Sequence, residues 1–114
     1  MKKSIVLSLL LMMVFGSVMK AEGTKKEKFK VYGNCGMCEK RIETAAKSVE
    51  GVSAADWNKD TKMMEVSYDS TKVNVNQIHL AIAKAGHDTE LDKASEEAYN
   101  SLPSCCQYLR KEDK

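Results

Sequence analysis

Two cysteines separated by two residues are the part of this 114-residue chain with the clearest chemistry. Cys35 and Cys38 lie in the stretch Gly-Asn-Cys-Gly-Met-Cys-Glu-Lys-Arg, residues 33–41. An alternating apolar run gives way there to helical spacing, so we expect a strand to lead into the first thiol and a helix to begin at the second. The free N–H groups and dipole of a helix N-terminus favour thiolate over thiol. Such a pair can bind a soft metal ion, cycle as a redox dithiol or form a static disulfide.

Three neighbours of this pair are candidates to tune it. Lys40 and Arg41 are expected to offset the negative charge of a two-thiolate metal centre, the alternative being solvated charges on a helix face. Met37 is either a thioether close to the ion or an apolar plug for the loop. As a structural crosslink the cysteine pair would be poor, because a disulfide that closes so short a loop removes little entropy from the unfolded chain.

A second pair of thiols, Cys105 and Cys106, lies near the C-terminus in Leu-Pro-Ser-Cys-Cys-Gln-Tyr, residues 102–108. Three roles are open for them. They are extra thiolate ligands that fold back on the first pair, one half of a disulfide that ties the tail to the domain, or a separate point of metal pickup on a mobile tail.

The first 23 residues have the pattern of a secretory signal peptide. A charged Lys2-Lys3 start precedes an apolar stretch from Ile5 to Phe15, and small residues follow before position 24. Removing residues 1–21 changes eighteen basic and sixteen acidic residues into fifteen and sixteen, a net charge of −1. This balance argues against a nucleic-acid-binding surface. We therefore expect a small exported protein in the bacterial periplasm, where its cysteines meet oxidising conditions.

The remaining chain predicts one small α+β domain. Residues 22–28 are expected to be a frayed lead-in. The pattern then predicts strands ending at Gly33, over about 52–57, over 64–68 and over 87–91, with helices over about 37–49 and 75–85. Asn74 and Gln77 are expected to form a capping box, and Gly86 to end the second helix. His79, which is off the apolar stripe of that helix, is expected at the surface.

The order β-α-β-β-α-β and four separated motifs resemble the heavy-metal-associated domain family. The motifs are the Cys-x-x-Cys after the first strand, Gly51-Val52, Tyr68-Asp69 and Ala85-Gly86-His87-Asp88. The resemblance implies a ferredoxin-like sandwich, a four-stranded antiparallel sheet with two helices on one face, over residues 24–91. Residues 1–23 are then a signal peptide, and residues 92–114 a cysteine-containing extension that the family domain does not need.

The loop before the first cysteine departs from the pattern of the resembled family. It usually has Gly-Met-Thr before the first cysteine, where this chain has Gly33 and Asn34. In the family the loop after the second helix approaches the metal loop, so the resemblance makes His87 a candidate third ligand or a group that tunes metal release with pH.

The resemblance implies a carrier of soft metal ions rather than an enzyme. Cys35 and Cys38 are the predicted metal ligands, with copper(I) as the expected ion and mercury(II) as the next. Zinc(II) prefers four ligands and would have to recruit Cys105 and Cys106. The expected partner is a membrane metal transporter or efflux component, and the expected state is a monomer, with a metal-bridged dimer as the alternative.

Two other functions stay open at this stage. The dithiol resembles that of thioredoxin-like oxidoreductases, whose sites also have a cis-proline facing the dithiol. The only proline here, Pro103, lies beyond the predicted domain. The other alternative is metal sequestration without delivery to a partner.

Overall fold

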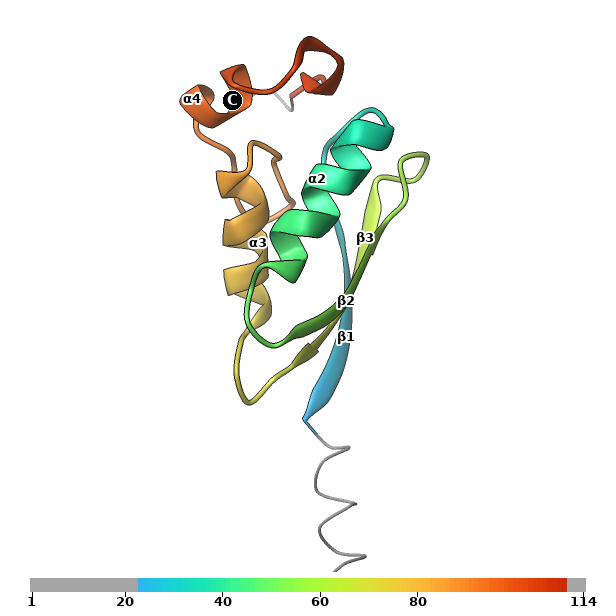
Figure 1. Ribbon diagram of the computed structural model, residues 1–114, viewed down its shortest axis with the longest axis vertical. Helices are drawn as coiled ribbons and strands as arrows, with labels where there is room; N and C mark the ends of the chain where they lie inside the picture. Colours follow the sequence, from blue (N-terminus) through green and yellow to red (C-terminus); the bar gives the residue numbers. More distant parts are fainter. Residues whose placement is uncertain (1–22, 111–114) are drawn as a thin grey trace, which may run out of the picture.

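A computed structural model describes residues 23–110 and has an α+β fold. Its elements follow the order β-α-β-β-α, with two short helical segments after them (Figure 1). The bounds are β1 Thr24–Lys30, α2 Gly36–Lys47, β2 Val52–Trp57, β3 Met63–Asp69, α3 Val75–Lys84, α4 Glu96–Asn100 and the 3-10 helix η1 Ser104–Cys106. None of the helices in this described part is long and apolar enough to cross a membrane.

The strands form an antiparallel sheet in the order β1-β3-β2. The central strand β3 alternates as predicted, with Met64, Val66 and Tyr68 buried. Across it, Met64 pairs with Phe29 of β1 and with Trp57 of β2, and both partners are buried as well. One face of the sheet therefore carries a large apolar surface that the helices have to cover.

Helices α2 and α3 cover that face side by side (Figure 1). They bring Ile42 and Ala46 of α2, and Ile78 and Ile82 of α3, into the core. The predicted capping box is confirmed, because Asn74 Oδ1 accepts the Gln77 N–H at 3.0 Å and Gln77 Oε1 accepts the Asn74 N–H at 3.0 Å.

Two predictions about the strands are wrong. The expected lead-in over 22–28 is mostly strand, since β1 begins at Thr24, which pairs with Asp69 at the end of β3. Its first five residues are exposed, so backbone pairing rather than burial holds them in the sheet. The hydrophobic periodicity of the sequence cannot reveal such a strand, because none of these five side chains is buried.

The expected fourth strand over 87–91 is reduced to one bridge, between Val31 and Thr89. Thr89 Oγ1 accepts the N–H groups of Leu91 and Asp92, at 3.2 and 3.0 Å. This side-chain turn directs the backbone away from β1, so the pairing is limited to this one bridge.

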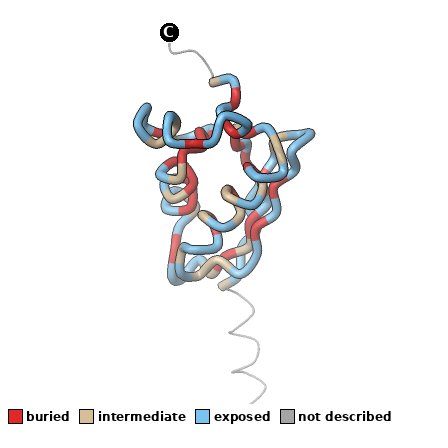
Figure 2. The backbone as a smooth tube through the Cα atoms, turned by 45° about the horizontal axis from the view of Figure 1, so that its top comes forward, coloured by how far each residue is buried: buried red, intermediate tan, exposed pale blue. Residues whose placement is uncertain are grey.

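The chain after residue 91 folds back across the end of the molecule at which α2 begins (Figure 1). This tail contains the short helix α4, and η1 follows it. Buried stretches occur in the sheet, in the helices and again in this tail, so the tail belongs to the packed structure (Figure 2). Its buried residues are Ala94, Leu102, Cys106 and Tyr108.

Candidate metal site

The first cysteine pair lies at the N-terminus of α2. Cys35 is the N-cap residue, with extended backbone, and Cys38 is the third residue of the helix. Their Sγ atoms are 3.5 Å apart. Cys38 is fully buried, whereas Cys35 is partly exposed. Both sulfurs can therefore contact one small ion, and Cys35 is the one that solvent reaches.

The position of Cys35 favours its thiolate form. The backbone N–H of Cys38 points toward the Cys35 sulfur and is the main cause that lowers the pKa of this thiol to about 7. Desolvation acts in the opposite direction, while the Cys38 side chain and the Met37 N–H lower the pKa further. The expectation of a thiolate at this helix start agrees with the geometry for Cys35.

The loop that carries Cys35 rests on a close-packed floor. Gly33 is buried, and a Cβ there would lie 3.0 Å from Trp57 Cη2 and 3.1 Å from Cys38 Cβ, so a larger residue would displace the loop. The indole N–H of Trp57 donates to the carbonyl of Val31 at 3.0 Å. Trp57 thus supports the strand-to-loop transition, a role the sequence alone did not assign to it.

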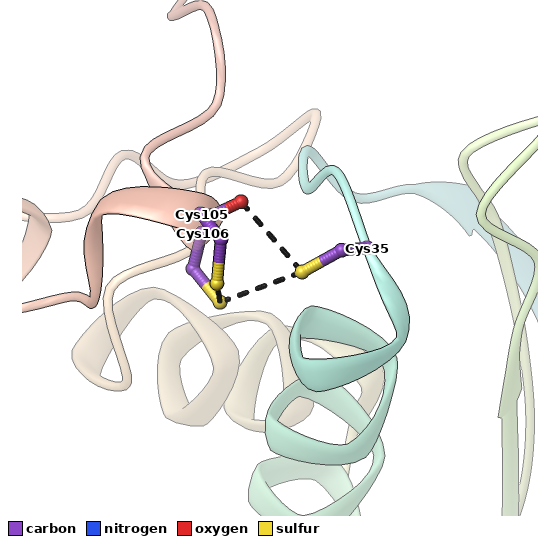
Figure 3. Close-up of side chains that lie close together, drawn as sticks. All are labelled: Cys35, Cys105 and Cys106. Atoms are coloured by element: carbon purple, nitrogen blue, oxygen red, sulfur yellow. Dashed lines mark hydrogen bonds between the residues drawn. The ribbon is translucent and has the colours of Figure 1, made fainter.

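The tail brings the second pair of thiols to Cys35 (Figure 3). Cys106 is fully buried, and its Sγ lies 3.8 Å from the Sγ of Cys35. The Cys35 thiol also donates to the Cys105 carbonyl oxygen at 3.6 Å. The ligand atoms of Cys35, Cys105 and Cys106 all lie within 4.8 Å of one another, a spacing that could hold a metal ion.

Cys106 faces both sulfurs of the first pair. Burial raises the pKa of its thiol, and the nearby thiols of Cys38 and Cys35 raise the pKa further. All four cysteines are free thiols, and the two adjacent tail sulfurs are 4.0 Å apart. Of the three roles that the sequence left open for the tail, the geometry agrees with thiols folded back on Cys35 and Cys38.

Met37 does not plug the loop. Its side chain is 54 % exposed, and its Sδ accepts a contact from the Cys105 thiol at 3.7 Å. The cluster thus comprises four thiols and one thioether, a set of soft donors that suits copper(I) and mercury(II) better than harder ions.

Lys40 and Arg41 lie on α2 close to Met37. With Met37 they line an open depression of about 490 Å³ beside α2, and neither contributes to the lowered pKa of Cys35. Their proposed role in offsetting thiolate charge stays a prediction.

His87 is fully buried. Its Nδ1 bonds to the carbonyl oxygen of Tyr32 at 2.8 Å, which places the ring proton on Nδ1, and its Nε2 is buried without a hydrogen-bond partner. Burial lowers the pKa of His87 and so favours the neutral ring. His87 is absent from the described clusters of potential metal ligands, so its role as a third ligand stays a prediction.

The prediction that His79 lies at the surface is wrong. The residue is 2 % exposed, its ring lies 3.9 Å from that of Phe29, and its Nδ1 bonds to Thr89 Oγ1 at 2.7 Å. The hydrogen bond with the Thr89 hydroxyl satisfies the buried ring nitrogen of His79. This allows a histidine to lie next to the apolar stripe of α3.

Three residues that the sequence analysis did not single out hold the tail in place. The Tyr108 hydroxyl donates to the Gly86 carbonyl at 2.8 Å and accepts the Asp88 N–H at 2.7 Å. Arg110 makes two hydrogen bonds to the buried Asp88 carboxylate, at 2.8 and 3.1 Å. The Tyr99 ring packs edge-on against Tyr108, with centroids 5.0 Å apart. The available signal in the sequence was an aromatic and a basic residue, Tyr108 and Arg110, two and four positions after Cys106.

Known proteins resemble the chain over the part that carries the first cysteine pair. Residues 31–88 match the heavy-metal-associated domain family. A copper chaperone CopZ of Staphylococcus aureus is 38 % identical over 55 residues, which cover 48 % of this chain and 81 % of the relative.

Solved structures give the same picture. Oxidized MerP of Ralstonia metallidurans has a TM-score of 0.56 at 31 % identity, over 59 % of this chain and 94 % of the other. The N-terminal domain of a potential copper-translocating P-type ATPase of Bacillus subtilis, solved in its Cu(I)-loaded state, has a TM-score of 0.56 at 28 % identity, over 64 % and 92 %.

Proposed function

Since the chain belongs to the heavy-metal-associated domain family, we propose that it binds copper(I) and passes it to a partner protein. The observation that carries the proposal is the pair of sulfurs 3.5 Å apart at the start of α2, within a cluster of five soft donors. Copper(I) is the expected cargo and mercury(II) the next, because both are satisfied by a few thiolates. Zinc(II) would require a full set of four ligands.

Binding exchanges protons for the metal ion. When the thiols of Cys35 and Cys38 both bind, each gives up a proton and copper(I) takes their place. A Cys35 thiol with a pKa near 7 loses its proton at low cost in neutral solution, so this sulfur is the natural first point of contact.

Transfer then proceeds by ligand exchange without any redox step. A thiolate of the partner forms a bond to copper(I), one bond from Cys35 or Cys38 breaks, and the released thiolate takes up a proton. Repeating the exchange moves the ion. The similarity to a copper chaperone and to a copper-translocating ATPase domain supports a membrane transporter or efflux component as the partner.

We further propose that the protein acts after export, in the periplasm. The support is the signal-peptide pattern of residues 1–23, nearly all of which lie outside the described residues. In that compartment the four free thiols would be exposed to oxidation unless an ion occupies them. A protein that works by binding and release needs no catalytic residue, so we propose no enzymatic activity.

The main alternatives are a thiol–disulfide oxidoreductase and a protein that holds metal without delivering it. The family match favours the metal role over the redox role, because it extends over residues 31–88 rather than over the dithiol alone. Sequestration and delivery of the metal differ only in whether the ion is transferred to a partner, and a transfer experiment distinguishes them.

Native mass spectrometry of the reduced 114-residue chain with copper(I), mercury(II) and zinc(II) tests the binding. We expect one copper(I) per chain, retained against a competing chelator. The double variant Cys35→Ser/Cys38→Ser should lose it. Stoichiometric copper in that double variant would overturn the assignment of the site.

Delivery is tested by mixing the copper-loaded chain with an isolated copper ATPase domain of the same family and following the ion. We expect the ion to redistribute between the two proteins within minutes. Retention of all copper by this chain would instead indicate sequestration. Rapid oxidation or reduction of a test protein's thiols by the metal-free chain would favour the oxidoreductase.

A further inference from the structure

The tail is held at one end of the molecule by contacts that do not involve its thiols. Tyr108, which is 2 % exposed, lies over His87 with ring centroids 5.4 Å apart, and its hydroxyl binds the backbone at Gly86 and Asp88. Arg110 binds the carboxylate of Asp88. The position of the tail is therefore fixed by the domain itself, and its cysteines are placed as a consequence.

This docking puts one tail thiol inside the site and the other at its rim. Cys106 is 0 % exposed, faces Cys35 at 3.8 Å and neighbours Cys38. Cys105 is exposed, and its sulfur contacts Met37 at 3.7 Å while lying within 4.8 Å of the sulfurs of Cys35 and Cys106. The two adjacent cysteines thus have different surroundings, and only Cys106 shares the buried space of the first pair.

The two sulfur separations that start from Cys35 suit an ion bound by three thiolates better than an ion bound by two. With a metal–thiolate bond of about 2.3 Å, two sulfurs on opposite sides of an ion lie about 4.6 Å apart, whereas three around it lie about 4.0 Å apart. The separations of Cys35 from Cys38 and from Cys106 are 3.5 and 3.8 Å. Small outward movements of the sulfurs would accommodate a trigonal ion, and a linear one would need the first pair to open by more than an ångström.

We propose that Cys106 is a third thiolate ligand, and that the docked tail closes a trigonal copper(I) site formed with Cys35 and Cys38. The proposal rests on the proposed function, because it assigns a ligand at the same site. Each ligand thiol loses its proton when the ion binds. Release to a partner then requires one incoming thiolate to replace Cys106, and the tail sets how readily the ion leaves.

X-ray absorption at the copper edge of the reduced, full 114-residue chain with one equivalent of copper(I) tests the ligand count. We expect three sulfurs around copper in the unmodified chain and in Cys105→Ser, and two in Cys106→Ser and Cys106→Ala. Cys105→Ser is the matched control, since it removes the adjacent thiol. Two sulfurs in the unmodified chain, or a loss of one sulfur on replacing Cys105 alone, would overturn the proposal.

A chelator competition gives a second measurement. Loss of a neighbour that merely orients a metal ligand weakens metal binding about 10- to 100-fold, so loss of Cys106 as a ligand should weaken copper retention by at least about tenfold. Unchanged retention in both Cys106 variants contradicts the inference while leaving the carrier function intact. Failure of the unmodified chain to bind more copper than Cys35→Ser/Cys38→Ser contradicts the carrier function itself.

Discussion

Replacing Tyr108 with Phe should loosen the tail without touching a thiol. The hydroxyl of Tyr108 satisfies the N–H of Asp88 and the carbonyl of Gly86, both buried beneath the ring. In the docked state of Tyr108→Phe both groups are left unpaired, whereas in the undocked state water reaches them. The variant therefore penalises docking specifically.

The expected size follows from the cost of leaving a buried polar group unsatisfied, about 1–3 kcal/mol. With two groups left unpaired the penalty is about 2–6 kcal/mol, so at about 1.4 kcal/mol per factor of ten the undocked population rises at least roughly 30-fold. Because Cys106 is fully buried, an alkylating reagent reaches it only when the tail is undocked, so its labelling rate should rise by the same factor.

The assay is alkylation followed by peptide mass spectrometry in a Cys105→Ser background. Trypsin cleavage after Lys93 and Arg110 then yields a peptide, residues 94–110, with Cys106 as its single thiol. Leu109→Ala is the matched control, because that side chain is 93 % exposed and should leave the rate unchanged. If Cys106 is labelled as fast as an exposed thiol while Tyr108 is intact, the tail is not docked. If Tyr108→Phe leaves the labelling rate unchanged, the hydroxyl does not hold the tail.

Three further predictions concern the domain. Gly86→Ala should destabilise the fold by more than about 1 kcal/mol in urea unfolding, because the residue has φ +111° and a Cβ would lie 2.9 Å from Leu102 Cδ2; Gly36→Ala, with open space around its Cβ, should have little effect. Alkylation of Cys35 in the metal-free chain should rise with pH and reach half its maximum near pH 7, where its pKa lies; a midpoint near the ordinary value of 9.0 would contradict the helix-start argument. Asn74→Ala should cost about 1 kcal/mol by thermal unfolding through loss of the helix cap, and Asn74→Ser should restore most of it.

The parts of the fold that the sequence predicted are those whose cause is local. The alternation of Met64, Val66 and Tyr68 requires only a strand with one buried face, and these residues are buried. Asn74 bonds to a residue three positions away. Gly86 ends a helix through its own backbone angle. Patterns of this kind can be recognised in the sequence without knowing which elements pack next to them.

The parts it missed depend on contacts between distant residues. His87 looks like an exposed histidine in a loop until Tyr108, 21 positions later, covers its ring. Cys106 lies next to Cys35, and the ion pair between Asp88 and Arg110 helps to hold the tail in that position. No periodicity encodes such pairs, so the sequence could offer three roles for the tail thiols without selecting one.

The shortened fourth strand leaves most of one margin of the sheet without a neighbouring strand among residues 23–110. An open strand margin is a surface on which another chain can add and start aggregation. Here β1 carries Lys25, Lys26, Lys28 and Lys30 along that margin, all exposed. A second molecule that approached with the same strand would bring two rows of ammonium groups together, so the lysines keep neighbouring copies from joining their sheets.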